Sequence, residues 1–228
     1  MTILLFGATG SAGGSVLRKC LASPLVAEVR VVVRRPTGLR NFKLREVIHQ
    51  DFLDFSAIAS SFEQVDACFY CLGISVMQVS GEAEYRRITH DMAMAAARTL
   101  KAKSPNAYFH FISGRSTDLE SRQMWARVKA ETERDLQALN EAVCWRPAAI
   151  DGVPSAREPF VFKVARPILR VVFGPFRGLY VKGEDIGAAM LEATTQHLRR
   201  RTFENAELRD YADAWNRRQP EPDVNSTW

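Results

Sequence analysis

Short apolar runs alternate with longer amphipathic stretches along the chain as far as residue 146. This alternation predicts βαβ units, in which helices cover a parallel sheet. Residues 29–33 are nearly all β-branched, which is typical of a strand buried on both faces. We therefore predict an α/β protein built on a Rossmann-type doubly wound parallel sheet.

The same pattern places the individual elements. The expected strands cover residues 3–6, 29–33, 67–72, 107–112 and 142–145, with a further short strand starting at Val47. The expected helices cover residues 12–22, 55–62, 82–103 and 122–141. Beyond residue 146 the pattern loosens, and prolines recur at positions 147, 154, 159, 167 and 175. We interpret this part as a small C-terminal region that covers a substrate, and we expect disorder after Arg217.

A glycine-rich turn with the spacing G-x-x-G-x-x-G joins the first expected strand to the first expected helix. The first glycine permits a sharp turn, the second lets the backbone approach a diphosphate, and the third lets helix and strand pack closely. Main-chain N–H groups at the helix start then face the phosphates. This context predicts a dinucleotide site, and a glycine-rich turn without a ligand is the alternative. The expected residues are Gly7, Thr9, Gly10, Ser11, Ala12 and Gly13.

The end of the second strand indicates which coenzyme binds. NAD-binding folds usually carry an acidic residue there for the ribose 2′-hydroxyl, whereas this strand ends in Val33, Arg34 and Arg35. A guanidinium group can bind a 2′-phosphate, which a carboxylate would repel. We therefore predict NADP(H) rather than NAD(H). The alternative is that both arginines are ordinary solvated loop residues.

Two later strand ends extend the predicted coenzyme site. Asp51 follows the third strand and can accept a hydrogen bond from the adenine amino group, or it can be a turn residue or helix N-cap. The adjoining Phe52 is assigned to the same site. Leu72 and Gly73 end the fourth strand, where the backbone passes the second half of the coenzyme.

The length of 228 residues suits one compact unit. We divide it into a dinucleotide-binding Rossmann domain, residues 1–150, and the substrate-covering region, residues 151–228. The net charge is +5, but lysines and arginines are scattered, so we expect no nucleic-acid partner. Met1 leads directly into an apolar strand, and no apolar stretch reaches bilayer length. We therefore expect no signal peptide and a cytoplasmic location.

The cysteines and histidines do not predict a redox or metal site. Cys68 and Cys71 are spaced C-x-x-C, but they lie in an apolar strand, where residues three apart point to opposite faces. We expect all four cysteines to be small buried side chains in a reducing compartment. The four histidines are dispersed without ligand spacing, so we expect no metal.

Together these motifs resemble the atypical short-chain dehydrogenases/reductases, most closely the Tat-interacting-protein-like and NmrA-like NAD(P)H-binding branch. The resemblance rests on the glycine turn, Arg34, Arg35, Asp51, the Cys-Leu-Gly-Ile-Ser sequence after the fourth strand, and Lys129. Looser matches follow at residues 146–152 and 181–187. The resemblance covers nearly the whole chain and implies a Rossmann fold that binds a nicotinamide coenzyme.

The resemblance also implies a catalytic set, namely a serine after the fifth strand and a Tyr-x-x-x-Lys on the next helix. Ser113 matches the serine, with Ser116 as a second candidate. Lys129 matches the lysine, which in the family holds the nicotinamide ribose and lowers the pKa of the tyrosine. Trp125 occupies the tyrosine position, on the same helical face as Lys129. Indole has one N–H and no proton to exchange near neutral pH, so Trp125 cannot do the acid–base work.

Two functions stay open for this combination of an intact coenzyme motif and an altered catalytic set. One is an NADP(H)-dependent oxidoreductase acting on a small carbonyl-type substrate, with Ser113 or a water-linked group polarising the oxygen and Tyr85 or Tyr180 as candidate replacements for the tyrosine. The other is a non-catalytic NADP(H)-sensing regulatory or protein-interaction module. Residues 160–176 form a basic amphipathic segment, which we expect to close the substrate pocket. Weak contact of this segment with a membrane or a protein is the alternative.

Overall fold

The computed structural model describes residues 1–153, 172 and 176–218. Its strands are β1 (Thr2–Phe6), β2 (Glu28–Val33), β3 (Leu44–Ile48), β4 (Ala67–Tyr70), β5 (Tyr108–Ile112), β6 (Val143–Arg146), β7 (Ala149–Asp151), β8 (Tyr180–Lys182) and β9 (Arg201–Glu204). Its α-helices are α1 (Ser11–Ala22), α2 (Glu82–Arg86), α3 (Met92–Lys103), α4 (Met124–Asn140), α6 (Gly183–Thr195) and α7 (Asn205–Arg218). A 3₁₀ segment at Ser56–Phe62, a short one at Val76–Gln78 and a π-helical turn at Arg87–Asp91 complete the described elements.

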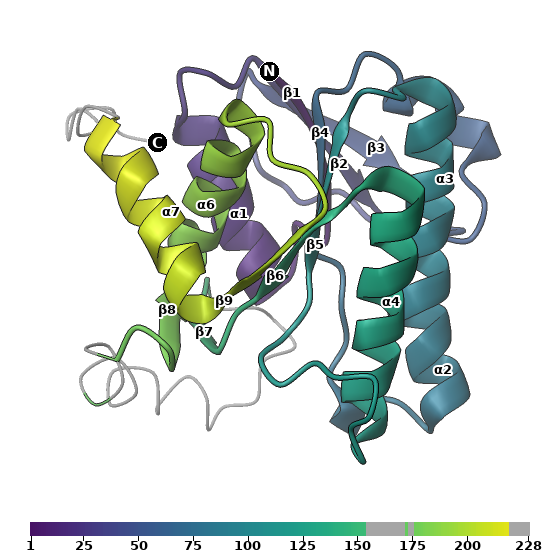
Figure 1. Cartoon of the computed structure of the whole chain (residues 1–228). Helices are drawn as coiled ribbons and strands as arrows, with labels where there is room; N and C mark the ends of the chain where they lie inside the picture. Colours follow the sequence, from purple (N-terminus) through teal and green to yellow (C-terminus); the bar gives the residue numbers. More distant parts are fainter. Residues whose placement is uncertain (154–171, 173–175, 219–228) are drawn as a thin grey trace.

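A seven-stranded parallel sheet in the order β3-β2-β1-β4-β5-β6-β9 forms the middle layer. Figure 1 shows α1, α6 and α7 on one face of this sheet and α2, α3 and α4 on the other. Alternate residues of each strand enter opposite cores, so Ile3 and Leu5 pack under α1 and α6, while Leu4 and Phe6 pack under α3. The predicted α/β class and Rossmann-type sheet are therefore confirmed.

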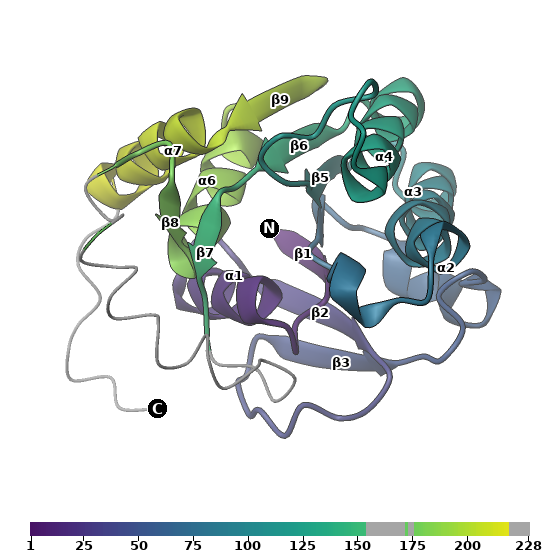
Figure 2. The same cartoon turned by 90° about the horizontal axis from the view of Figure 1, so that it is seen from below.

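The strand order reverses between β1 and β4. From β1 the chain crosses to β2 and β3 on one side, and it then returns to β4 and β5 on the other. In open α/β sheets ligands bind beyond the carboxyl ends of the strands at such a switch point. Figure 2, seen from below, shows β7 and β8 at this end of the molecule, beside the start of α1.

Several boundaries differ from the sequence prediction. The third strand begins at Leu44 rather than Val47, and the fourth ends at Tyr70. The stretch expected as one helix over residues 82–103 is helical, but it widens into a π turn at Arg87–Asp91. A single hydrophobic period does not reveal such a turn, because the apolar stripe of α3 begins after it.

The C-terminal region contains elements that the sequence pattern did not predict. After β8 come α6, β9 and α7, and β9 pairs in parallel with β6 to add the seventh strand. Part of this region therefore extends the sheet, and its expected role of covering a substrate stays a prediction. In β9 only Phe203 is buried, so the strand carries almost no hydrophobic signal.

Two predicted features fall wholly or mostly outside the described residues. The basic amphipathic segment at residues 160–176 lies almost entirely within the undescribed stretch, and so does most of the tail expected to be disordered. Among the described helices, none combines the length and the apolar character needed to cross a bilayer.

Helices α1 and α6 pack unusually closely because glycines line their contact. A Cβ on Gly187 would lie 2.9 Å from the Cβ of Lys19 and 3.1 Å from the Cα of Val16. A Cβ on Gly183 would lie 2.4 Å from the Oγ of Ser15. The close crossing fixes α1, and therefore the turn that precedes it, against the C-terminal region.

Candidate functional site: a dinucleotide cradle and an adjoining cavity

The turn after β1 is a cradle that requires glycine at two positions. Gly7 has a φ of +79°, and a Cβ there would lie 2.5 Å from the carbonyl oxygen of Cys71. A Cβ on Gly13 would lie 2.1 Å from the carbonyl oxygen of Gly7. Gly10 closes the turn by donating its N–H to that same oxygen over 2.9 Å, while Ala12 packs partly against the core beneath α1. These contacts give the first and third glycines the steric roles expected from the motif.

The start of α1 offers main-chain donors to an anion. The N-cap residue is Gly10, which has no side-chain cap, and the first turn of the helix contains no acidic residue. Thr9 is exposed beside it, and the backbone of Ser11 accepts a hydrogen bond from the N–H of Val153 over 3.2 Å. Gly152 rests directly on Ser11, where a Cβ would lie 2.4 Å from the carbonyl oxygen. A glycine turn and a helix start without a carboxylate fit a diphosphate group.

The arginines after β2 are exposed at the expected place. Arg34 and Arg35 follow Val33 directly, and the Arg34 carbonyl accepts a hydrogen bond from the Nε2 of Gln50 over 2.7 Å. Among the described residues, neither guanidinium forms an ion pair. Their charge is therefore available to an anionic group at this end of the sheet.

Asp51 and Phe52 lie at the end of β3 in different surroundings. Asp51 is exposed, and its Oδ1 accepts the N–H of Leu53 over 2.9 Å, as in an Asx turn. Phe52 is buried against Phe6 and Phe55 in edge-to-face contacts. The turn role of Asp51, one of the alternatives from the sequence, is present, and its contact with adenine stays a prediction. The side chain of Phe52 belongs to the core, so only its backbone can face a coenzyme.

Leu72 and Gly73 follow β4 across the switch point from the glycine turn. The backbone nitrogen of Leu72 lies 2.7 Å from where a Cβ on Gly7 would stand, so the two strand ends touch here. A Cβ on Gly73 would meet no atom within 4 Å. No protein atom therefore excludes a side chain at Gly73. The predicted close approach of a coenzyme would explain why the residue is glycine.

Ser113, Trp125 and Lys129 come together beyond the end of β5. The Nζ of Lys129 donates to the carbonyl oxygen of Ser113 over 2.7 Å. A Cβ on Gly114 would lie 3.8 Å from the Cδ of Lys129 and 3.9 Å from the Cζ3 of Trp125. The structure therefore places these three residues around one turn, with the side chains of Lys129 and Trp125 beside the backbone of Ser113 and Gly114. Their chemical roles stay predictions.

The hydroxyl of Ser113 has a partner that the sequence did not indicate. Ser113 is buried, and its Oγ lies 3.1 Å from the Oγ1 of Thr117. Thr117 in turn donates to the carbonyl oxygen of Gly114 over 2.7 Å. Because the Thr117 proton is used there, Ser113 is the donor in the bond between the two hydroxyls. Ser113 must give up this bond before it can donate to a substrate oxygen.

Lys129 lies in an environment that disfavours its charge. Burial lowers its pKa to about 8, and the nearby Glu133 carboxylate partly opposes this shift. The ammonium also lies 5.7 Å from the centre of the Phe111 ring. A lysine with this pKa exchanges a proton near neutral pH, which an ordinary surface lysine does not.

A cavity of about 570 Å³ opens beside this cluster. The described residues of its lining are Gly114, Arg115, Ser116, Trp125, Pro147, Ala148, Ala149 and Leu179. Tyr85 and Tyr180 do not line it, although both are buried, and the hydroxyl of Tyr180 donates to Asp151 over 2.6 Å. The second serine candidate, Ser116, does lie in the lining.

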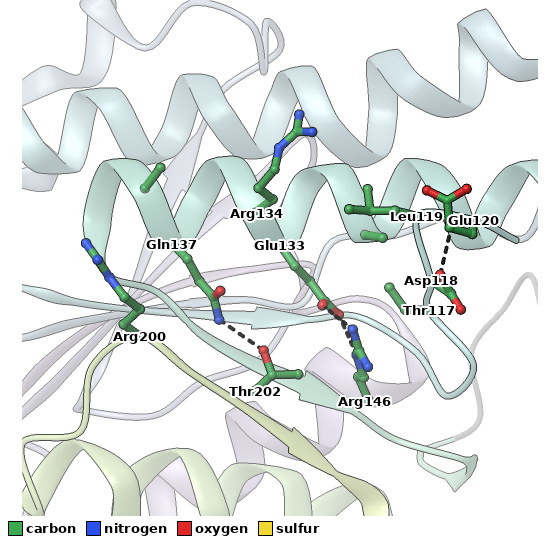
Figure 3. A pocket seen from close by; sticks show the side chains of 12 residues that line it. Thr117, Asp118, Leu119, Glu120, Glu133, Arg134, Gln137, Arg146, Arg200 and Thr202 are labelled. Carbon is green, nitrogen blue, oxygen red and sulfur yellow. Dashed lines mark hydrogen bonds and ion pairs between the residues drawn. The ribbon is translucent and has the colours of Figure 1, made fainter.

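A larger hollow of about 780 Å³ lies between α4 and the edge formed by β6 and β9 (Figure 3). Its centre is an ion pair in which Arg146 contacts both oxygens of Glu133, at 3.0 and 2.7 Å, and also reaches Glu204. Gln137 bonds Thr202 across the same hollow. Its other arginines also face carboxylates, in the pairs Arg134–Asp135 and Arg200–Glu141. Because each of its three arginines is paired with a carboxylate, we interpret this hollow as structural.

A family model described as NAD(P)H-binding matches residues 7–140, from the first glycine of the cradle to the end of α4. The chain belongs to this NAD(P)H-binding family. The match confirms the predicted NAD(P)H-binding domain, without distinguishing NADP(H) from NAD(H).

Sequence relatives support the predicted branch of the NAD(P)H-binding family. The mitochondrial protein fmp52-2 of Aspergillus oryzae is 28% identical over 153 residues, which cover 65% of this chain and 67% of the relative. The rat protein HTATIP2 is 26% identical over 141 residues, which cover 60% of this chain and 57% of the relative. The resemblance to the atypical short-chain dehydrogenases/reductases is thereby confirmed.

Solved structures with the same fold include two enzymes. The dTDP-glucose 4,6-dehydratase DesIV of Streptomyces venezuelae, with NAD and TYD bound, superposes with a TM-score of 0.69 at 15% identity over 93% of this chain and 80% of its own. A short-chain dehydrogenase/reductase family oxidoreductase of Burkholderia thailandensis gives 0.67 at 13% identity, over 89% of each chain. At these identities the likeness concerns the fold alone.

The cysteines are buried or partly buried side chains of the two cores. Cys68 packs in the core under α3, whereas Cys71 packs in the core under α1, so the two thiols face opposite sides as predicted. All four cysteines are free. Within the described part of the chain, no cluster of ligating side chains could hold a metal ion.

Sequence reasoning missed three parts of the site, namely Thr117, the contact of Gly152 with Ser11, and Arg115 in the cavity lining. Gly152 had a signal, because it closes the looser motif at residues 146–152. Thr117 and Arg115 lie in a loop, where no periodicity indicates which side chains face a cavity.

Proposed function

We propose that this protein is an NADP(H)-dependent oxidoreductase acting on a small carbonyl-type substrate. The observation that carries the proposal is the cavity beside Trp125 and Lys129, which opens at the sheet end that holds the glycine cradle. When bound, the coenzyme supplies a hydride at its nicotinamide C4. Lys129 holds an exchangeable proton near this cavity, and the indole N–H of Trp125 can orient a substrate oxygen without protonating it.

The preference for NADP(H) rests on Arg34 and Arg35. Replacing both by alanine should raise the Kd for NADPH about tenfold to a hundredfold, because charge-assisted contacts to the 2′-phosphate are lost. The Kd for NADH should change less than about threefold, since it lacks that phosphate. Titration calorimetry on both coenzymes measures the difference.

Arg98→Ala serves as the control for this experiment, because it removes an exposed arginine from α3, away from β2. It should leave both Kd values unchanged. Equal losses for NADPH and NADH in the double variant would refute the assignment of the two arginines.

The reaction itself is tested by NADPH consumption with a panel of aldehydes, ketones and quinones, followed at the nicotinamide absorbance. Consumption that depends on the carbonyl compound and is lost in Lys129→Met supports the oxidoreductase. Tight NADPH binding without turnover across the panel contradicts it and supports the second candidate.

The second candidate is a protein that senses NADP(H) and acts through a partner. Two observations favour it. Trp125 cannot exchange a proton, and the Ser113 hydroxyl already donates to Thr117. Coenzyme binding should then change the protease cleavage pattern of the C-terminal region without any chemical turnover.

The expected cytoplasmic location is also part of this proposal. The fungal relatives carry the word mitochondrial in their names, so an organelle is the alternative location. Fractionation of cells that express the tagged full-length chain decides it. Recovery in a membrane or organelle fraction would contradict the cytoplasmic assignment.

A further inference from the structure

The cavity beside Trp125 differs from the larger hollow in whether its arginine is paired with a carboxylate. Among the described residues of its lining, Arg115 is the charged one, and none carries a carboxylate. Arg115 is exposed, and its guanidinium forms no ion pair with any residue that the structure describes. In the hollow of Figure 3, by contrast, the arginines face carboxylates.

Arg115 is held in place by the main chain. Its N–H donates to the carbonyl oxygen of Pro147 over 3.0 Å, and the N–H of Ser113 donates to that of Trp145 over 2.7 Å. These two bonds continue the pairing of β5 and β6 beyond the ends of the strands. The next residue, Ser116, has a φ of +65°, a conformation that is uncommon for a residue other than glycine. The arginine therefore stands on a fixed backbone at the rim of the cavity.

Apart from Arg115 and Ser116, the described lining is apolar and includes one large flat surface. Pro147, Ala148, Ala149 and Leu179 form an apolar wall, and the N–H of Ala149 bonds the carbonyl of Leu179 over 3.2 Å. Trp125 contributes its indole ring, which can stack on a planar molecule. The volume of about 570 Å³ lies within the range of roughly 300–1,000 Å³ that is usual for small-molecule sites.

We infer that this cavity takes a planar, apolar small molecule that carries one carboxylate, with its ring on Trp125 and its carboxylate on Arg115. The inference rests on the proposed function, because it names the substrate class for the same site. A guanidinium binds a carboxylate through two parallel N–H bonds, which also fixes the orientation of the bound molecule. Lys129, whose Nζ donates to the carbonyl oxygen of Ser113, adds positive charge nearby. Arg115 would then be a specificity-determining residue.

Benzoate and benzamide test this inference, since they share shape and differ in charge. Both are titrated calorimetrically into the full-length chain, with and without saturating NADP⁺. We expect benzoate to bind the unaltered chain at least about tenfold more tightly than benzamide, as a charge-assisted bidentate contact implies. Arg115→Met should abolish this preference, whereas Arg115→Lys should retain part of it.

Two further variants separate the roles of ring and charge. Trp125→Leu should weaken both probes by a similar factor, because both lose the same stacking surface. Arg98→Met, on α3, removes an exposed arginine elsewhere and should change neither probe. Equal affinity for both probes in the unaltered chain, an unchanged preference in Arg115→Met, or no binding of either probe would overturn the inference.

The outcome is distinguishable from failure of the proposed function. A benzoate preference that depends on Arg115, in a protein that oxidises no NADPH, would keep the ligand class and remove the catalytic role. Turnover of 4-methylbenzaldehyde at the same rate as 4-carboxybenzaldehyde, together with equal binding of benzoate and benzamide, would keep the reaction and remove the ligand class.

Discussion

His110 lies in the middle of β5 and is completely buried. The indole N–H of Trp145 donates to its Nδ1 over 3.1 Å, so the ring proton is on Nε2. That Nε2 donates to the Oγ1 of Thr194 over 3.0 Å, and the Thr194 hydroxyl donates to the carbonyl oxygen of Met190. Every polar atom of the ring is thus satisfied in the neutral form. Its two side-chain partners come from β6 and α6.

Burial lowers the pKa of His110 to about 3 from an ordinary value of 6.5. Between these values the unfolded chain binds one more proton than the folded chain, so the stability falls as the pH is lowered from about 6.5 towards 3. From pH 7 to pH 5 this residue should cost about 2 kcal/mol of unfolding free energy. Urea unfolding at the two pH values measures the change.

His110→Asn is the comparison, because it removes the titrating ring. The variant should be less stable at pH 7, but its unfolding free energy should decrease by about 2 kcal/mol less between pH 7 and pH 5 than that of the unaltered chain. The same decrease in both proteins would show that His110 does not titrate between the folded and unfolded states.

At the scale of elements, the contact between α1 and α6 positions the glycine-rich turn that precedes α1. The sequence showed each glycine of the turn, because a strand–turn–helix is a local unit. It did not show that Gly183 and Gly187 let a helix from far along the chain pack against Ser15, Val16 and Lys19. Contacts between elements that are remote in sequence leave no periodic signal of their own.

Gly187→Leu tests this contact. The added side chain would collide with the Cα of Val16, so we expect a loss of about 1–3 kcal/mol in unfolding free energy, as is usual for overpacking. Helix α1 would also shift, so NADPH binding should weaken in the variant even where it remains folded. Thermal unfolding and titration calorimetry provide the two measurements.

Glu184→Leu places the same side chain on the exposed side of α6. It should change the stability by less than about 1 kcal/mol, since it removes an exposed carboxylate from the first turn of the helix without adding a steric clash. If both variants were equally stable, the close crossing of the two helices would not be what holds α1 in place.

At the scale of the whole molecule, the coenzyme-binding part and the C-terminal region share one core. Trp145 of β6, Phe203 of β9 and Trp215 of α7 are buried in the same cluster as the residues under α1. The boundary at residue 150 that the sequence suggested therefore runs through a shared core. The prediction that residues 1–150 and 151–228 form one unit can be tested by truncation.

A chain truncated after residue 150 should fail to fold cooperatively. It would expose the apolar face of α1 and one face of Trp145, which α6, β9 and α7 cover in the full chain. We expect no sharp thermal transition and no measurable NADPH binding, by circular dichroism and calorimetry. Cooperative unfolding together with coenzyme binding by residues 1–150 would contradict the shared core.

The sequence by itself determined the class of the fold, the place of the glycine turn, and the two arginines after β2. Each of these depends on residues that are neighbours along the chain, where a steric demand or a period acts locally. Only the tertiary structure decided that β9 joins the sheet, that Ser113 donates to Thr117, and that Arg115 lines a cavity with Trp125. These contacts join segments whose separation in sequence says nothing about their distance in space, and packing of the whole chain brings them together.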